Sequence, residues 1–97
     1  MIEHVVLFKL KPDAPPGTVQ RIKDALHSLR GCVPGMLQFQ VTDNFADRAK
    51  GFSLVLFSRF VTREALAAYA VHPAHVKVVE TVIKPAMEEV IAADGHV

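Results

Sequence analysis

One short run of the chain combines side chains that are suited to proton transfer. YAVHPAHVKVV, residues 69–79, holds Tyr69, His72 and His75 around Pro73. Histidine has an ordinary pKa of about 6.5, so it can accept or donate protons at neutral pH. A tyrosine hydroxyl can donate a hydrogen bond to an oxygen that gains negative charge. The run predicts a site where His75 is the base and Tyr69 its oxyanion partner, acting on a small, largely apolar carbonyl compound.

The same run has simpler interpretations, which the residues alone leave open. Pro73 favours the first position of a new helix, so His72 marks a boundary and could cap that helix. Tyr69 and His75 could be partly buried residues whose polar atoms are satisfied. A metal shared by His72 and His75 is disfavoured, because zinc needs three or four ligands and no Cys or carboxylate lies nearby before Glu80. We predict no metal site and count His72 among the possible ligand contacts.

His4 is a third candidate, because it interrupts an apolar strand face. The alternate residues of that face are Ile2, His4, Val6, Phe8 and Leu10. An imidazole in such a setting needs a polar partner. If the face turns toward the helices, His4 shares a cavity with Tyr69 and His75 and orients the ligand; if not, it lies half solvated near the strand end. The apolar lining of that cavity is predicted to be Val6, Phe8, Leu54 and Leu56.

Composition excludes several functional classes. The 97 residues predict one domain, and the formal net charge of +1, with no Trp and one Tyr, gives no signal for nucleic-acid binding. No apolar run approaches the roughly 20 residues that span a bilayer, and the N-terminus does not resemble a signal peptide. A single cysteine, Cys32, fits a reducing cytoplasm. No flavin, haem or nucleotide motif occurs, so we expect no cofactor.

Hydrophobic periodicity predicts four strands and two crossover helices. The expected strands are residues 2–10, 36–43, 52–60 and 87–93, followed by a frayed tail. The first helix begins at residue 18 and stops at Gly31. The second is capped by Thr62 and interrupted at Pro73, and a second short helix then runs to the residue before Pro85. This β-α-β-β-α-β order predicts an α+β, ferredoxin-like fold with a four-stranded antiparallel sheet and helices on one face.

Two helices cover only one face of such a sheet, yet strands 2–10 and 52–60 are apolar on both faces. With 51% hydrophobic residues, the chain carries more apolar surface than a small domain hides alone. We therefore predict a homodimer that packs the two open sheet faces together as a dimeric α/β barrel. On the outer face of the first helix, His27 is expected to be solvated beside Lys23 and Arg30. Cys32 has no neighbouring base and is read as structural.

Three segments together resemble the stress-responsive dimeric α/β barrel (Dabb) family: EHVVLFKLK, NFADRAKGF and AYAVHPAHVKVVETVIKP. HPAHV is the most specific of these motifs, and the resemblance covers nearly the whole chain, as a single domain over residues 1–97. It implies a ferredoxin-like subunit, a homodimer built by sheet packing, and a cavity between sheet and helices in each subunit.

Function within that family is heterogeneous, and the resemblance implies more than one activity. One branch, the olivetolic acid cyclase-like enzymes, cyclises linear polyketides without a cofactor. It is similar to this chain at His4, Tyr69 and His75, and the resemblance makes His75 the base and Tyr69 the assistant at the carbonyl oxygen. Where that branch has a further histidine, this chain has Leu54. Aromatic residues of the cyclase pocket are replaced in this chain by Ile22, Lys23 and Leu26, so the pocket should differ in shape.

Three functions are therefore expected, in descending order. The first is a cofactor-free cyclase or lyase acting through Tyr69 and His75. The second is a non-catalytic, stress-associated dimer that binds a small hydrophobic molecule. The third, a monooxygenase-like activity, rests on fold analogy alone.

Overall fold

The computed structural model describes residues 1–97 and has the element order that the sequence predicts. The elements are β1 (Ile2–Leu10), α1 (Thr18–His27), β2 (Met36–Asp43), β3 (Leu54–Phe60), α2 (Arg63–Val71), α3 (Pro73–Val78), the π-helical η1 (Val79–Ile83), α4 (Lys84–Ala86) and β4 (Met87–His96). Segments α3, η1 and α4 follow one another without a gap and act as one long helix.

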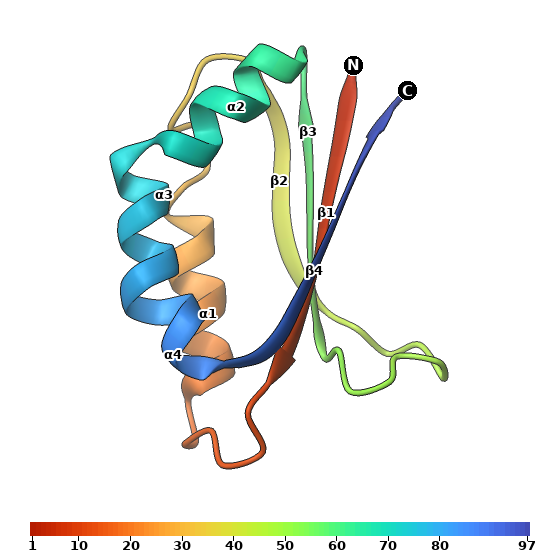
Figure 1. Cartoon of the computed structure of the whole chain (residues 1–97), viewed down its shortest axis with the longest axis vertical. Helices are drawn as coiled ribbons and strands as arrows, with labels where there is room; N and C mark the ends of the chain where they lie inside the picture. The colour runs from red at the N-terminus through yellow and green to blue at the C-terminus, as the bar shows by residue number, and fades with distance from the viewer.

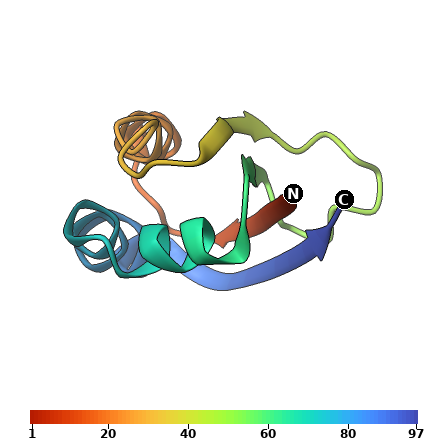
Figure 2. The ribbon, with the colours of Figure 1, turned by 90° about the horizontal axis from the view of Figure 1, so that it is seen from above.

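The four strands form one antiparallel sheet in the order β2-β3-β1-β4. All helices lie on the same side of this sheet, as the two orthogonal views show (Figures 1 and 2). The predicted ferredoxin-like fold is confirmed. None of the helices is long and apolar enough to cross a membrane.

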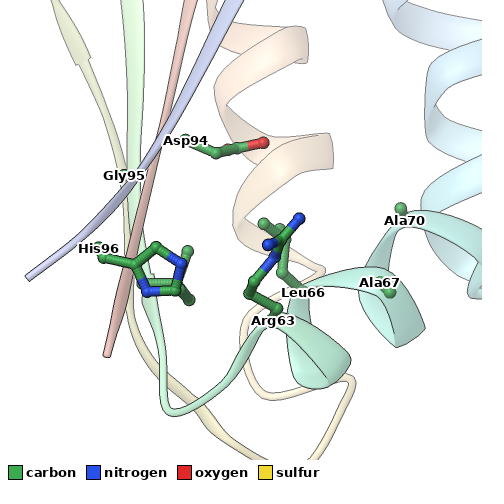
Figure 3. Close-up of a pocket in the computed structure, with 8 residues that line it drawn as sticks. Arg63, Leu66, Ala67, Ala70, Asp94, Gly95 and His96 are labelled. Carbon is green, nitrogen blue, oxygen red and sulfur yellow. The ribbon is translucent and has the colours of Figure 1, made fainter.

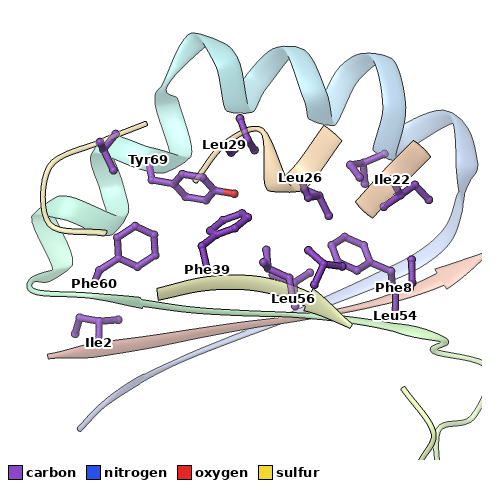
Figure 4. Close-up of a cluster of buried hydrophobic side chains, with 14 residues drawn as sticks. Ile2, Phe8, Ile22, Leu26, Leu29, Phe39, Leu54, Leu56, Phe60 and Tyr69 are labelled. Carbon is purple, nitrogen blue, oxygen red and sulfur yellow. The ribbon is translucent and has the colours of Figure 1, made fainter. Parts of the chain in front are cut away.

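The core fills the space between the helices and the inner face of the sheet (Figure 4). Strand alternation supplies one side of it: Leu54, Leu56, Ser58 and Phe60 are buried along β3, and their neighbours are only half-buried. The stripe predicted for the first helix supplies the other side through Ile22, Leu26 and Leu29. Burying each such aliphatic or aromatic side chain stabilises the fold by about 1.5–3 kcal/mol.

The other face of the sheet carries no covering element, and we call it the open face. Its central apolar residues alternate with the buried ones and lie opposite one another across β1, β3 and β4: Val5, Leu7, Val55, Phe57, Ile91 and Ala93. The ion pair of Glu3 with Arg59 lies at one end of this patch. The prediction that β1 and β3 are apolar on both faces is confirmed.

The predicted bounds of β3 and β4 need correction. β3 begins at Leu54 and not at residue 52, although Phe52 is buried. β4 runs to His96, so the frayed tail expected after residue 93 is ordered. Its polar and small side chains suggested coil, but backbone pairing needs no apolar side chain: Ile2 lies opposite His96 in the β1–β4 register.

The predicted helix end before Pro85 is also wrong. Pro85 lies in the first turn of α4, directly after the π-helical segment. Proline is favoured at the start of a helical segment, and here the change from π-helical to α-helical geometry directly before Pro85 supplies such a position within the continuous helix. In β2, Leu37 belongs to the same apolar alternation as the buried Phe39 and Val41, but a register shift between Met36 and Gln38 leaves it 48% exposed.

The first helix region holds the edge strand β2 through three polar side chains. Lys23 Nζ lies 3.0 Å from Asp43 Oδ1, His27 Nε2 accepts the Val41 N–H at 3.2 Å, and the Arg30 guanidinium donates to the Phe39 carbonyl at 2.8 and 3.0 Å. One helical turn rises about 5.4 Å and two strand residues span about 6.8 Å. Each of the three helix-side residues therefore lies close to its own partner along β2. The predicted solvated role of His27 is therefore wrong.

Removing the His27 acceptor should destabilise the fold, because the Val41 N–H on the sheet edge then loses its partner. We expect His27→Ala to lower the free energy of unfolding by about 1–2 kcal/mol. Urea denaturation followed by circular dichroism measures the change. The control is Lys77→Ala, since Lys77 is exposed and only its backbone carbonyl takes part in a side-chain hydrogen bond, from Thr81. Equal stability of the two variants would contradict the bond's role.

Candidate functional site

A break in the second crossover helix lies at His72, as the sequence predicts. His72 adopts an extended conformation (φ −63°, ψ 133°) between α2 and α3, and Pro73 opens α3. The His72 Nδ1 atom accepts the N–H of Ala74 at 3.1 Å. His72 is therefore the cap of α3. It does not line the cavity described below, which corrects its place among the ligand contacts.

The break brings Tyr69 and His75 together. Their ring centroids are 4.4 Å apart at an interplanar angle of 46°. On an unbroken helix, residues six apart would point in directions about 120° apart around the axis, with a rise of about 9 Å between them. The His75 Nδ1 atom lies 2.9 Å from the Ala70 carbonyl oxygen, to which it donates. This bond fixes the tautomer and leaves Nε2 as the acceptor of the ring.

The Tyr69 hydroxyl is buried and has no hydrogen-bond partner in the protein. The residue is 2% exposed and packs against Phe39 and Phe60, with its hydroxyl directed toward Leu26 (Figure 4). It therefore makes no hydrogen bond to His75, and the two rings meet by packing. Burial, aided by the Cys32 thiol, raises the pKa of the Tyr69 hydroxyl well above its ordinary value. Tyr69 is consequently a protonated, unpaired donor.

His4 lies on the same side of the sheet, edge-on to Tyr69. The two ring centroids are 6.4 Å apart at 67°, and the His4 side chain is 14% exposed. Its Nδ1 atom pairs with a carboxylate oxygen of Asp94, which lies directly opposite it in the β1–β4 register. Of the two positions considered for His4, the structure shows the one on the sheet face that turns toward the helices, beside Tyr69 and His75. Sequence reasoning missed Asp94, because the residue fell in the expected tail; antiparallel pairing of the first and last strands was the signal that could have found it.

A cavity of about 460 Å³ lies between the inner face of β1 and β4 and the broken helix. Six of the residues predicted to line this cavity do so: His4, Val6, Phe8, Leu56, Tyr69 and His75. Leu54 does not line it, because that side chain is fully enclosed in the core. Apolar side chains predominate, and Lys84, Glu88 and Glu89 also border the cavity.

A second hollow of about 410 Å³ adjoins the first and shares Leu66 and Ala70 with it. Its polar residues are Arg63, Asp94 and His96 (Figure 3). The His4–Asp94 pair thus lies between the two hollows, with His4 lining the first and Asp94 the second. No three histidine, cysteine, aspartate or glutamate side chains converge as metal ligands.

The cavity thus combines three polar side chains with a largely apolar lining. Two imidazoles each have Nδ1 engaged, so each can present Nε2 to a ligand. The third group is the Tyr69 hydroxyl, which is buried and has no partner in the protein. A mostly apolar wall surrounds them, which strengthens such polar contacts by excluding water.

Comparison with known sequences agrees with the fold and the motif. Residues 2–97 match the family described as the stress responsive A/B barrel domain, Dabb. A curated relative from Arabidopsis thaliana, a stress-response A/B barrel domain-containing protein, is 35% identical over 95 residues. The alignment covers 97% of this chain and 36% of the relative, so the chain spans little more than a third of that protein's length.

Solved structures show the same fold at low identity. A dimeric ferredoxin-like protein of unknown function from Thermobifida fusca superposes with a TM-score of 0.87 at 20% identity, covering 99% of this chain and 90% of that one. A hydroxynitrile lyase from Passiflora edulis gives 0.86 at 18% identity, covering 99% and 92%. With the HPAHV motif at the helix break and the family match over residues 2–97, the chain belongs to the stress-responsive A/B barrel (Dabb) family.

Proposed function

We propose that this chain is a cofactor-independent cyclase or lyase that acts on a small, polyketide-like carbonyl compound. One observation carries the proposal: the Tyr69 hydroxyl is buried without a partner in a residue that lines a cavity shared with two imidazoles. Leaving a buried donor unpaired costs about 1–3 kcal/mol. A ligand oxygen would supply the missing acceptor.

The reaction needs a proton acceptor and a group that stabilises charge on oxygen. In a cyclisation, the Nε2 atom of His75 takes a proton from a carbon next to a carbonyl group, which in a linear triketone such as heptane-2,4,6-trione is a terminal methyl carbon. The resulting enolate carbon attacks a distant carbonyl carbon of the same molecule, and that carbonyl oxygen becomes an alkoxide. Tyr69 donates a hydrogen bond to an oxygen that gains charge. The imidazolium then returns its proton to the alkoxide, and loss of water with enolisation of the two remaining ring ketones makes the ring aromatic.

A lyase reaction would use the same groups to break a carbon–carbon bond, whereas the cyclisation forms one. For a cyanohydrin, a base removes the hydroxyl proton and the bond to the nitrile carbon breaks, giving an aldehyde and cyanide; the protonated base then gives its proton to the cyanide, which leaves as hydrogen cyanide. The Passiflora edulis neighbour is named a hydroxynitrile lyase. This supports including a cyanohydrin as a second probe beside a linear triketone.

Turnover of heptane-2,4,6-trione to orcinol and water is the direct assay. We expect Tyr69→Phe to lower the rate by about 10²–10³-fold, as loss of one oxyanion donor does. We expect His75→Ala to lower it by about 10²–10⁴-fold through loss of the base. Orcinol is quantified by chromatography, and cleavage of mandelonitrile to benzaldehyde is followed by absorbance.

A matched control is His72→Asn, because asparagine also caps a helix and His72 lies outside the cavity. This variant should keep full activity. If wild type converts neither probe but binds one of them, the non-catalytic binding function replaces the enzyme. If all variants are as active as wild type, Tyr69 and His75 have no catalytic role.

We further propose that the chain forms a homodimer through its open face. The apolar patch on that face supports this, because a sheet of this kind is stable in water when another layer covers it. The dimeric state of the Thermobifida fusca neighbour supports it as well. Two copies related by a two-fold axis would bury the same patch on each subunit.

A charge in the centre of the patch should separate the subunits. We expect Phe57→Lys to raise the dimer dissociation constant at least about 100-fold, since each copy would bury an unpaired ammonium. Sedimentation velocity measures the change. The control is Val71→Lys, which places the same charge on the exposed side of α2, where Val71 is 75% exposed. A wild-type monomer at high concentration, or equal dissociation constants, would contradict the proposal.

A further inference from the structure

The helical wall of the second hollow is one face of α2. Its residues there are Arg63, Leu66, Ala67 and Ala70. They are spaced i, i+3, i+4 and i+7, so they lie on the same side of the helix. Leu66 and Ala70 also line the first cavity, and the two alanines leave the wall open because each carries only a methyl group. The same helix face therefore leads from Arg63 to the cavity that Tyr69 lines.

Arg63 is a cation without a charged partner in the protein. The chain forms five side-chain ion pairs, and Arg63 takes part in none of them. Figure 3 shows its guanidinium extending from α2 into the space between the helix and the sheet. A guanidinium carries only donors, and their planar arrangement matches a carboxylate through two parallel hydrogen bonds. The second hollow therefore has an unused donor group for an acidic part of a ligand.

The opposite wall limits the charge of that acidic part. It is formed by Ile2 and the end of β4, where the Asp94 side chain points into the same space (Figure 3). Asp94 pairs with His4 and is not a partner of Arg63. Its carboxylate repels a doubly charged phosphate more strongly than a singly charged carboxylate. The hollow thus fits a ligand carboxylate better than a ligand phosphate.

The distance along α2 sets the length of the ligand. Tyr69 lies six residues after Arg63, which corresponds to about 9 Å along a continuous helix. A ligand whose carbonyl oxygen lies beside Tyr69 therefore reaches Arg63 only through a spacer of several carbon atoms. Leu66 lies between the two positions and lines both hollows, so it offers an apolar contact to that spacer.

We propose that the second hollow is a subsite for the carboxylate end of the ligand, and that Arg63 selects this end. The inference rests on the proposed use of the first cavity as the carbonyl site. It narrows the ligand class to keto acids in which an apolar chain separates the carbonyl from the carboxylate. Arg63 is a specificity-determining residue in this arrangement, because it contacts the ligand away from the reacting carbonyl.

Matched keto acids and esters test the subsite by isothermal titration calorimetry, without requiring turnover. The probes are 4-oxopentanoate, 7-oxooctanoate and their methyl esters, since each ester keeps the chain and removes the charge. Wild type should bind 7-oxooctanoate at least about tenfold more tightly than its methyl ester. 4-Oxopentanoate should show no such advantage over its ester, because its chain is too short to reach both hollows.

Two variants separate the charge of the subsite from its space. Arg63→Gln removes the cation, and Ala67→Leu fills a position that lines the second hollow but not the first. Each should abolish the advantage of 7-oxooctanoate over its ester, while methyl 4-oxopentanoate, which needs only the first cavity, should bind as it does to wild type. The controls are Arg48→Gln and Ala68→Leu, which make the same changes at exposed positions outside both hollows. Both controls should behave as wild type.

The outcomes distinguish the subsite from the proposed reaction. If 7-oxooctanoate binds wild type no better than its ester, or if Arg48→Gln weakens its binding as much as Arg63→Gln does, the subsite is wrong. Binding of the esters would then still support the first cavity as a carbonyl site. If the triketone is not turned over but the advantage of the acid depends on Arg63, the reaction is wrong and the subsite is supported.

Discussion

One extended residue in the middle of a helix is the constraint on which the site depends. His72 leaves the helical conformation because Pro73 follows it, and its own ring caps the new helix by accepting the Ala74 N–H. The change of direction brings the Tyr69 and His75 rings into contact at a tilted angle, although continuous helix geometry would point them apart. It also leaves the Ala70 carbonyl without a helical partner, and His75 donates to it. The HPAH motif is thus a structural element that places two chemical groups.

The pairing of β1 with β4 supplies the second half of the site. Antiparallel register places Asp94 opposite His4 and extends the sheet beyond the cover of the helices. The same one-sided cover has two results. It leaves a cavity between the inner face and the broken helix, and it leaves an apolar patch on the open face. The proposed ligand site and the proposed dimer contact therefore share one cause, since two crossover helices cannot enclose a four-stranded sheet.

Periodicity predicted the fold and part of the site, because the determining signals are local. The alternation in β2 and β3, the stripe of the first helix and the break at Pro73 are each visible in a few consecutive residues. The roles of His27 and Asp94 depend on partners that lie 14 and 90 residues away, so no local pattern marks them. Leu54 was placed in the cavity because it shares a strand face with Leu56. Only the packing of the helices distinguishes a side chain that is enclosed from one that borders a hollow.

The central claim is that the cavity beside His4, Tyr69 and His75 binds carbonyl compounds. The most direct measurement is an NMR titration of the histidine rings with a panel of small aromatic and polyketide-like carbonyl compounds. We predict that one class of compound shifts the His4 and His75 signals together, at one affinity, while the signals of His27 at the β2 edge are unaffected. If no compound shifts His4 or His75, or if all histidines respond equally, the cavity is not a ligand site and the HPAH motif serves the fold alone.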